Sequence, residues 1–358
     1  MLALKQLSVT HYGATVYKMK APITINSRSK IYHQRGVALI LVMGVVALIT
    51  ILVTNLTYST HLSSRRAAMM IKSFKAEYLL KSAINAARVL LQNDKTPEDS
   101  PKDIWGPFIQ GMELPAEIFE IPEYNVRLSL EIRPEESKIP LSALVSTPSR
   151  INTPDKLWRD VLLRLFINLG FAQDQEQDQT PLFKGRIFTP EEMVANLIDF
   201  IDEDSTPYID GNFRSIESEQ TSDFFLNRKI TRIGELSGVP GFTQARIRKM
   251  SPFLTTAVRM GQVNINVAPR IVLKSLHEDM TDEMVERMIQ QRAGDAGPIK
   301  TLSDLIGFPQ LQGITTGGRF FQVVAKVDYG VAAFFARSII ERPANGNEPP
   351  RQISLELF

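Results

Sequence analysis

The sequence predicts an α+β protein in which a long N-terminal helix packs on an antiparallel sheet and a large helical region is inserted between the strands. Three observations lead to this prediction. A long uncharged apolar run lies near the N-terminus, alternating strand patterns occur both before and after the centre, and helix-period segments fill the centre. The 358 residues are enough for one large domain or about two to three small domains with hydrophobic cores.

The apolar run extends from Val37 to Leu56 and contains no charged residue. At about 1.5 Å of rise per residue, a helix over this run is about 30 Å long, which matches the hydrocarbon core of a bilayer. We therefore predict a single transmembrane helix over residues 37–57.

A basic leader over residues 1–36 precedes this span. It carries six Lys and Arg residues and no acidic residue, and it meets the apolar run at Gly36. A secretory signal has its small-residue cleavage site after the apolar region, so this layout differs from such a signal. The leader begins at Met1 or at Met19, and its charge predicts a cytoplasmic N-terminus and an exported C-terminal part.

The helix is predicted to continue beyond the membrane. From Thr57 to Gln92 there is no Pro or Gly, and apolar residues recur mostly at spacings of three and four. The second half is amphipathic, so we expect its apolar stripe to pack on a sheet. A span followed by a separate surface helix is the alternative. Pro97 and Pro101 end the helical pattern.

Strand patterns lie on both sides of the centre. Alternation of apolar and polar residues predicts strands at Asn125–Ile132 and 321–327. Val331–Ile340 and Ile353–Phe358, which the turn-rich segment ERPANGNEPP separates, are further strand candidates. We therefore expect the second half of the long helix and the first strands within residues 58–140. The strands that close the sheet are expected within residues 319–358.

The centre of the chain predicts helices, several of which begin with a Thr cap or with Pro in the first turn. The predicted helical segments are TPDKLWRDVLLRLFINLG, TPEEMVANLIDFID, TQARIRKMSPFLT, VAPRIVLKSL and TDEMVERMIQQRAG. We expect them to form two helical domains similar to sterile-alpha-motif (SAM-like) bundles, over residues 141–262 and 263–318.

One internal repeat is visible in this centre. ITRIGELSGVPGF, from Ile230, and IKTLSDLIGFPQL, from Ile299, share a frame in which a helix ends at Gly and turns through Pro. The first copy resembles a helix-hairpin-helix, whose backbone amides can bind a DNA phosphate, although Thr243 stands where that motif usually has Gly. Packing within a helical bundle is the other interpretation, and we favour it.

Acidic residues gather at the end of the predicted helix that begins at Thr189, and in the loop that follows. They are Asp199, Asp202, Glu203, Asp204, Asp210, Glu217, Glu219 and Asp223. Carboxylates and free carbonyl groups of such a loop can bind a hard cation, and Ca²⁺ is the candidate cofactor. The spacing is not that of an EF-hand, and a solvated acidic loop is the alternative.

Composition and motifs give little support for catalysis or for a nucleic-acid partner. Beyond the leader the chain carries 35 basic and 39 acidic residues, and it has no Cys, which excludes disulfides and thiolate metal sites. The four His residues have no metal-ligand spacing, and no phosphate-binding Gly loop or nucleophile elbow occurs. We therefore predict a protein that is not an enzyme.

Five motifs of this chain together resemble those of the minor pseudopilin K family of type II secretion. The motifs that carry the resemblance are QRGVALILVM, KIPLSALV, LIDFIDEDSTP, ITRIGELSGVPGF and VNINVAPRIVL, in this order from Gln34 to Leu273. The resemblance extends from about residue 35 to the C-terminus. It implies a type IV pilin-like fold with a SAM-like insertion, and a prepilin leader at the N-terminus.

The resemblance also implies how the N-terminus is processed. A prepilin peptidase would cleave between Gly36 and Val37, and Val37 would be N-methylated, although many relatives have Phe at that position. Most pilin-like proteins have Glu at the fifth mature position, where this chain has Leu41. A carboxylate in the bilayer core is costly unless it is paired, so Leu41 fits a tip subunit that has no neighbour above it. An ordinary membrane anchor is the alternative.

The resemblance further implies the partners and the location. The chain would cap the tip of the periplasmic pseudopilus and help to start its assembly, with the I-type and J-type minor pseudopilins, the major pseudopilin, the prepilin peptidase and the inner-membrane secretion platform as partners. It would span the inner membrane once, with a periplasmic C-terminal domain. Calcium in the helical domain of some relatives supports the proposed cation site. A membrane-anchored helix-hairpin-helix protein of DNA uptake is the alternative function.

Overall fold

The structure is a computed structural model that describes residues 35–115, 126–145, 154–217, 225–294, 297–343 and 348–358. The chain divides into two compact units, 1–67 and 68–358, and each is described by itself. Helix α1 (Arg35–Asn93) is continuous, as predicted. In the first unit its large apolar side chains are all exposed. Within the described chain, this is the one helix long and apolar enough to cross a membrane, which fits a single-pass anchor.

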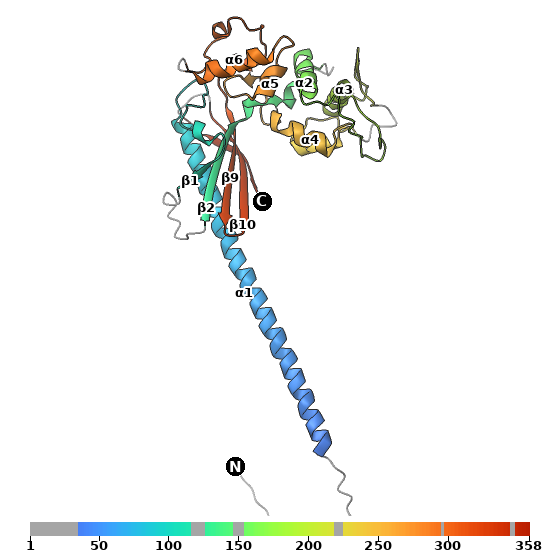
Figure 1. Ribbon diagram of the computed structural model, residues 1–358, viewed down its shortest axis with the longest axis vertical. Coiled ribbons are helices and arrows are strands. Elements are labelled where there is room, and N and C mark those ends of the chain that lie inside the picture. Colours follow the sequence, from blue (N-terminus) through green and yellow to red (C-terminus); the bar gives the residue numbers. More distant parts are fainter. Residues whose placement is uncertain (1–34, 116–125, 146–153, 218–224, 295–296, 344–347) are drawn as a thin grey trace, which may run out of the picture. The chain divides into compact units, whose positions relative to one another are not determined.

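In the second unit, α1 buries one face against a sheet, and Figure 1 shows strands running beside this part of the helix. The buried helix residues are Ala76, Leu80, Ala83, Ile84, Ala87 and Leu91. Their spacing of three and four places them on one face. They form a hydrophobic cluster with inward residues of the strands, such as Leu130, Val323 and Ala336. The predicted amphipathic half of the helix is therefore confirmed.

Among the described residues, the sheet has five strands in the order β1-β2-β9-β10-β11, and all neighbours are antiparallel. Its strands are β1 (Met112–Leu114), β2 (Val126–Pro134), β9 (Phe320–Tyr329), β10 (Ala332–Glu341) and β11 (Arg351–Leu357). Burial alternates along β2 and β9, as the sequence predicted for a half-buried sheet. Strand β1 was not predicted, because three residues are too few to show a period.

The helical region lies between β2 and β9 in the chain, so it is an insertion in the sheet domain. Its helices are α2 (Lys156–Asn168), α3 (Pro190–Ile201), α4 (Gln244–Met250), α5 (Arg270–Ser275) and α6 (Asp282–Ala293). The hydroxyl groups of Thr189, Thr243 and Thr281 cap α3, α4 and α6 by accepting backbone N–H bonds. The predicted α+β class with a helical insertion is confirmed.

Short elements connect the helices. The 3-10 helices are η1 (Gly106–Phe108), η3 (Glu135–Ser137), η4 (Leu141–Ala143), η6 (Ile233–Gly238), η7 (Ser251–Phe253) and η8 (Leu302–Leu305). The short strands are β3 (Ile139–Pro140), β4 (Ile209–Asp210), β5 (Phe213–Arg214), β6 (Leu254–Thr255), β7 (Val263–Asn264) and β8 (Ile314–Thr315). β3 pairs with β6, and β7 pairs with β8, both in parallel. Segments far apart in the sequence therefore meet in these two pairs.

The helical region has one hydrophobic core. Trp158 of α2, Phe200 of α3, Met250 of α4 and Val285 of α6 all belong to the same buried cluster. The two proposed SAM-like domains therefore share apolar packing, and their division at residue 262 remains a proposal.

Candidate functional site

The predicted processing residues lie at the start of α1. Gly36, Val37 and Leu41 are helical, and the side chains of Val37 and Leu41 are exposed. A Cβ atom added at Gly36 would meet no atom within 4 Å. A larger side chain at position 36 can therefore be tested without disturbing the packing of the described residues.

The predicted acidic cluster forms around the end of α3. The helix begins with a capping box between Thr189 and Glu192, and it ends at Ile201. Asp199, Asp202 and Glu217 are all nearly fully buried there. Both carboxylate oxygens of Asp199 accept the backbone N–H of Tyr208, at 3.0 and 3.1 Å.

These buried carboxylates destabilise one another when they are charged. Burial raises the pKa of Asp199 to about 7, and the neighbouring charges of Glu217 and Asp204 act in the same direction. Burial raises the pKa of Asp202 to about 8, with further contributions from Asp199, Asp204 and Glu217. Such a cluster is expected to bind protons or a cation.

Three buried oxygens in this region have no hydrogen-bond partner. They are Oδ1 of Asp202, Oε2 of Glu217 and Oδ1 of Asn227. The Nδ2 group of Asn227 donates to the backbone oxygen of Asp204 (2.6 Å) and to Oε1 of Glu217 (3.2 Å), so its amide is held against the cluster. Buried oxygens without donors are rare and match the oxygen ligands that Ca²⁺ prefers. The type of these oxygens suits a hard cation, but the acidic residues of the described chain whose ligand atoms all lie within 4.8 Å of one another are Asp94, Asp99 and Asp103, not these.

Asn227 was missed by sequence reasoning. It is the one non-Gly residue of the described chain with a positive φ, 45°. Asn tolerates this left-handed conformation better than most residues. The sequence around it, FFLNRK, gives no sign that the amide reaches a loop that lies 23 residues earlier.

The carboxyl groups of the other predicted acidic residues differ from these three in exposure or in partners. Glu203 and Asp204 are exposed, and Oδ1 of Asp204 accepts the backbone N–H of Thr206. Asp210 forms an ion pair with Arg159, whose guanidinium lowers the pKa of that carboxyl group. Glu219 and Asp223 lie outside the described residues.

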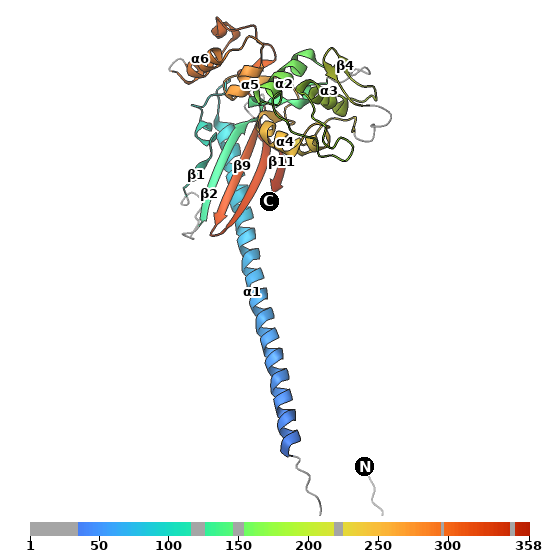
Figure 2. The ribbon, with the colours of Figure 1, turned by 45° about the vertical axis from the view of Figure 1, so that its right-hand side comes forward.

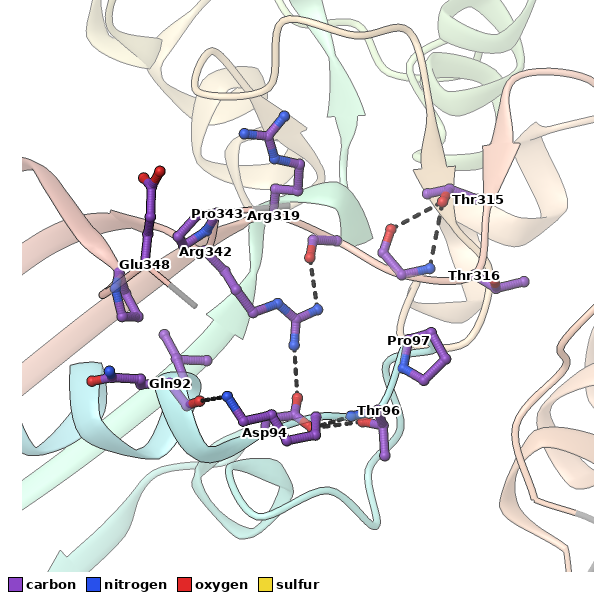
Figure 3. Close-up of a pocket in the computed structure, with 15 residues that line it drawn as sticks. Gln92, Asp94, Thr96, Pro97, Thr315, Thr316, Arg319, Arg342, Pro343 and Glu348 are labelled. Atoms are coloured by element: carbon purple, nitrogen blue, oxygen red, sulfur yellow. Dashed lines mark hydrogen bonds and ion pairs between the residues drawn. The ribbon is translucent and has the colours of Figure 1, made fainter. Parts of the chain in front are cut away.

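A second group of carboxylates lies in the segment that follows α1, and Figure 3 shows one of them, Asp94. Asp94, Asp99 and Asp103 approach within 4.8 Å of one another, a spacing that a metal could bridge. Arg342, however, donates to Asp94 (2.7 Å) and to Asp99 (2.7 Å). The second oxygen of Asp99 accepts from Nδ2 of Asn264 (2.7 Å). The group is an ion-pair network in which protein donors occupy the oxygens.

This network joins the helical insertion to the sheet. Glu136, which follows β2, accepts the backbone N–H groups of Arg319 and Phe320 at the start of β9. Asp99 also accepts the N–H of Gly318. Burial raises the pKa of Asp99 to about 6 and that of Glu136 to about 7. A pocket of about 500 Å³ opens beside these residues (Figure 3).

The first hairpin of the internal repeat is used for packing. Gly241 has φ +90°, and its N–H donates to Oδ2 of Asp178 (2.7 Å) in the interior. A Cβ atom at Gly241 would lie 2.8 Å from Cβ of Phe188. The amide that a helix-hairpin-helix would present to a phosphate is therefore covered and bonded to a carboxylate, and nothing here favours the DNA-binding alternative.

Comparison with known proteins relates this architecture to one family. A family model described as type II secretion system (T2SS), protein K, matches residues 263–325, which contain β7, β8 and most of β9. A provisionally named type II secretion system protein K of Escherichia coli (strain K12) is 23% identical over 224 residues. The predicted resemblance to the K family is confirmed. The chain aligns with 62% of the length of that K protein, and 62% of this chain is covered.

One solved structure has the fold that the resemblance to the K family implies. It is a chain of the crystal structure of the GspK–GspI–GspJ complex from the enterotoxigenic Escherichia coli type 2 secretion system. The likeness has a TM-score of 0.56 and 16% identity, and it covers 84% of this chain and 99% of the other. The two chains therefore share their overall fold over the 84% of this chain that the match covers.

Proposed function

We propose that this chain is a minor pseudopilin of a type II secretion system, which caps the tip of the periplasmic pseudopilus and helps to start its assembly. The observation that carries the proposal is the helical insertion between β2 and β9, within an antiparallel sheet that packs on one long helix. This is a structural role, without catalysis by the chain itself.

The proposal includes processing at the N-terminus. A prepilin peptidase removes residues 1–36 by cutting between Gly36 and Val37, and Val37 is then N-methylated. The span then holds the chain in the inner membrane with its N-terminus cytoplasmic and its large domain periplasmic. The basic leader and the exposed apolar part of α1 support this orientation.

The partners follow from the tip position. In a stacked rod, a charged residue in the membrane segment needs a partner from a neighbouring subunit. Leu41 needs none, so the chain can occupy the end of the rod. We propose the I-type and J-type pseudopilins and the major pseudopilin as its neighbours, with the peptidase and the inner-membrane platform as transient partners. The complex in which the matched chain was solved supports the first two.

We also propose that the site at the end of α3 holds Ca²⁺. Asp202, Glu217 and Asn227 would hold it through their unpartnered oxygens, and Asp199 lies next to them. The cation would supply positive charge among these buried carboxylates. The residues themselves hold the loop that follows α3, because Asn227 joins the backbone of Asp204 to Glu217.

A single substitution tests the proposed processing. Replacing Gly36 by Leu should leave a precursor that keeps the leader, because a peptidase site adapted to Gly has no room for a larger side chain. Gly44→Leu is the matched control, since a Cβ atom at either position meets nothing within 4 Å. Gly44→Leu should be processed normally. If Gly36→Leu is processed like the control, the pseudopilin proposal fails.

A further inference from the structure

The helical insertion contains a strongly basic segment over residues 228–259. This segment has seven basic residues and one acidic residue, Glu235, whereas the rest of the chain beyond the leader has 28 basic and 38 acidic residues. One of the seven, Arg246, is buried and bonded to Asp174. The other six are exposed, namely Arg228, Lys229, Arg232, Arg248, Lys249 and Arg259. Positive charge is therefore concentrated at one part of the insertion surface.

The fold brings the exposed cations of this segment together. Elements η6 and α4 are joined by the turn at residues 239–243 and pack against each other. Helix α4 continues through η7 into β6, and Oγ1 of Thr256, just after β6, donates to the backbone oxygen of Thr231 (3.1 Å). This bond ties the two ends of the hairpin together. We use the name basic surface for Arg232, Arg248, Lys249 and Arg259, which lie at these ends and at the end of α4.

The basic surface has one side in the core and one side in solvent. Leu236 of η6, Met250 at the end of α4 and Leu254 of β6 are buried in the core of the insertion. Figure 2 shows α4, in yellow, at the lower edge of the insertion, as does Figure 1. The hydrophobic core therefore fixes the elements that present these cations to solvent.

The charges of the basic surface are not used within the described chain. Its four cations form no ion pair with any described residue. Exposed cations elsewhere in the insertion differ, since Arg270 pairs with Glu286 and Lys274 pairs with Asp282. A group of exposed, unpaired cations on a fixed scaffold attracts an anionic ligand.

An acidic cluster borders the basic surface and limits the anions that can bind there. The side-chain amide of Asn227 donates to the backbone oxygen of Asp204 (2.6 Å), and Arg228 follows Asn227 directly. Glu203 and Asp204 are both exposed. Duplex DNA and an anionic membrane carry negative charge over a wide area, so these carboxylates would repel them. A short acidic segment can contact the basic surface without meeting the carboxylates.

The donors of the basic surface suit carboxylates. Three of its four residues are Arg, and a guanidinium can donate two parallel hydrogen bonds to one carboxylate. The hairpin amide that could bind a phosphate, that of Gly241, donates to Asp178 instead. Binding at this surface therefore depends on side-chain cations.

We propose that the basic surface binds an acidic peptide segment of a partner protein. The segment presents Asp or Glu side chains to Arg232, Arg248, Lys249 and Arg259 and is short enough to end before Glu203 and Asp204. This inference goes beyond the proposed function and does not depend on it.

Fluorescence anisotropy with a defined peptide tests the proposal. The full chain is placed in nanodiscs of phosphatidylcholine, a lipid without net charge, at about 0.15 M salt. The probe is a labelled peptide rich in Asp and Glu, and the reference peptide has Asn and Gln at the same positions. We expect the acidic peptide alone to bind, and its affinity to fall as salt is raised. Failure of the acidic peptide to bind, or equal binding of both peptides, overturns the proposal.

Two double variants locate the binding. Arg248→Gln with Lys249→Gln removes two charges from the basic surface and should weaken binding of the acidic peptide about tenfold. Lys184→Gln with Lys300→Gln is the matched control, because it removes the same charge from two exposed residues elsewhere in the insertion. The control should weaken binding less than about twofold. Equal weakening by both double variants overturns the proposed surface.

Other anions decide whether a peptide is the right class of ligand. Duplex DNA and vesicles of phosphatidylglycerol are offered to the same nanodiscs at the same salt concentration. Both should bind more weakly than the acidic peptide, because Glu203 and Asp204 repel them. Tighter binding of either one, lost in the variant with Arg248→Gln and Lys249→Gln, overturns the choice of an acidic peptide.

Discussion

Arg342 and Asp99 form a 2.7 Å ion pair that joins the residue after β10 to the loop after α1. The same guanidinium also bonds to Asp94, so one cation holds two carboxylates in the interior. Asp99 is in turn bonded to Asn264 in the helical insertion. This residue pair therefore connects the sheet, the long helix and the insertion.

The first prediction concerns this ion pair. Arg342→Met should lower the free energy of unfolding by about 3 kcal/mol, because two buried carboxylates lose their cation. Arg351→Met is the control, since Arg351 and Glu348 form an exposed pair worth less than about 1 kcal/mol. Urea unfolding followed by fluorescence measures both, with Trp105 as a reporter, because its indole N–H donates to Asp94. Equal effects of the two substitutions would contradict the assigned role.

The second prediction concerns pH. The pKa of Glu136 is raised to about 7 by burial, so the folded protein binds a proton there at a higher pH than the unfolded chain does. The stabilising contribution of this proton is present at low pH and is lost as pH rises through about 7. The raised pKa of Asp99 also makes the folded protein less stable as pH rises, because its proton is lost as pH rises through about 6.

The variant Glu136→Gln isolates this effect, because Gln carries no charge and can still accept the N–H groups of Arg319 and Phe320. Between pH 5 and pH 8, the unfolding free energy of the wild type should fall by about 2 kcal/mol more than that of the variant. Denaturant unfolding at several pH values measures the difference. Parallel pH profiles would show that Glu136 does not titrate in this range.

The third prediction concerns the first hairpin of the repeat. Gly241→Ala should destabilise the protein by about 2 kcal/mol or more, since its φ of +90° is strained for Ala and the new Cβ would lie 2.8 Å from Phe188. Gly234→Ala is the control, because a Cβ atom there meets nothing within 4 Å. Thermal unfolding compares the two variants. A melting temperature of Gly234→Ala below that of Gly241→Ala would contradict the close packing of Gly241 against Phe188.

The fourth prediction concerns the proposed calcium site. Ca²⁺ at about one hundred times its dissociation constant should stabilise the wild type by about 2.7 kcal/mol. Asp202→Asn and Glu217→Gln should lose most of this gain, because each replaces a carboxylate that has an unpartnered oxygen. Asp210→Asn should keep it, since Asp210 is paired with Arg159. Thermal unfolding with Ca²⁺ and with a chelator measures the gain. A gain that all three variants retain would exclude this site.

The sequence predicted the elements whose pattern is local. The spacing of Ala76, Leu80 and Ala83 places one helix face on the sheet, and alternation along β2 and β9 places their inner residues in the core. The Thr caps marked where α3, α4 and α6 begin. Such features depend on residues only a few positions apart, so one sequence is sufficient to find them.

The contacts that define the candidate sites could not be predicted in this way. Arg342 and Asp99 are separated by 243 positions, and nothing in either neighbourhood selects the other. Asn227, which has a left-handed backbone conformation, donates a long-range hydrogen bond from its side-chain amide to Asp204 beside the acidic cluster. Asp210, which was expected in that cluster, instead pairs with Arg159. The strand order of the sheet likewise does not follow from periodicity.

The most direct test of the whole account is affinity purification of the full chain. It would be extracted with mild detergent from membranes of cells that make a complete type II secretion system, and bound proteins identified by mass spectrometry. The account predicts a mature chain that begins at Val37 and that brings the I-type and J-type pseudopilins with it. A chain that retains residues 1–36 and is recovered without either pseudopilin would contradict it.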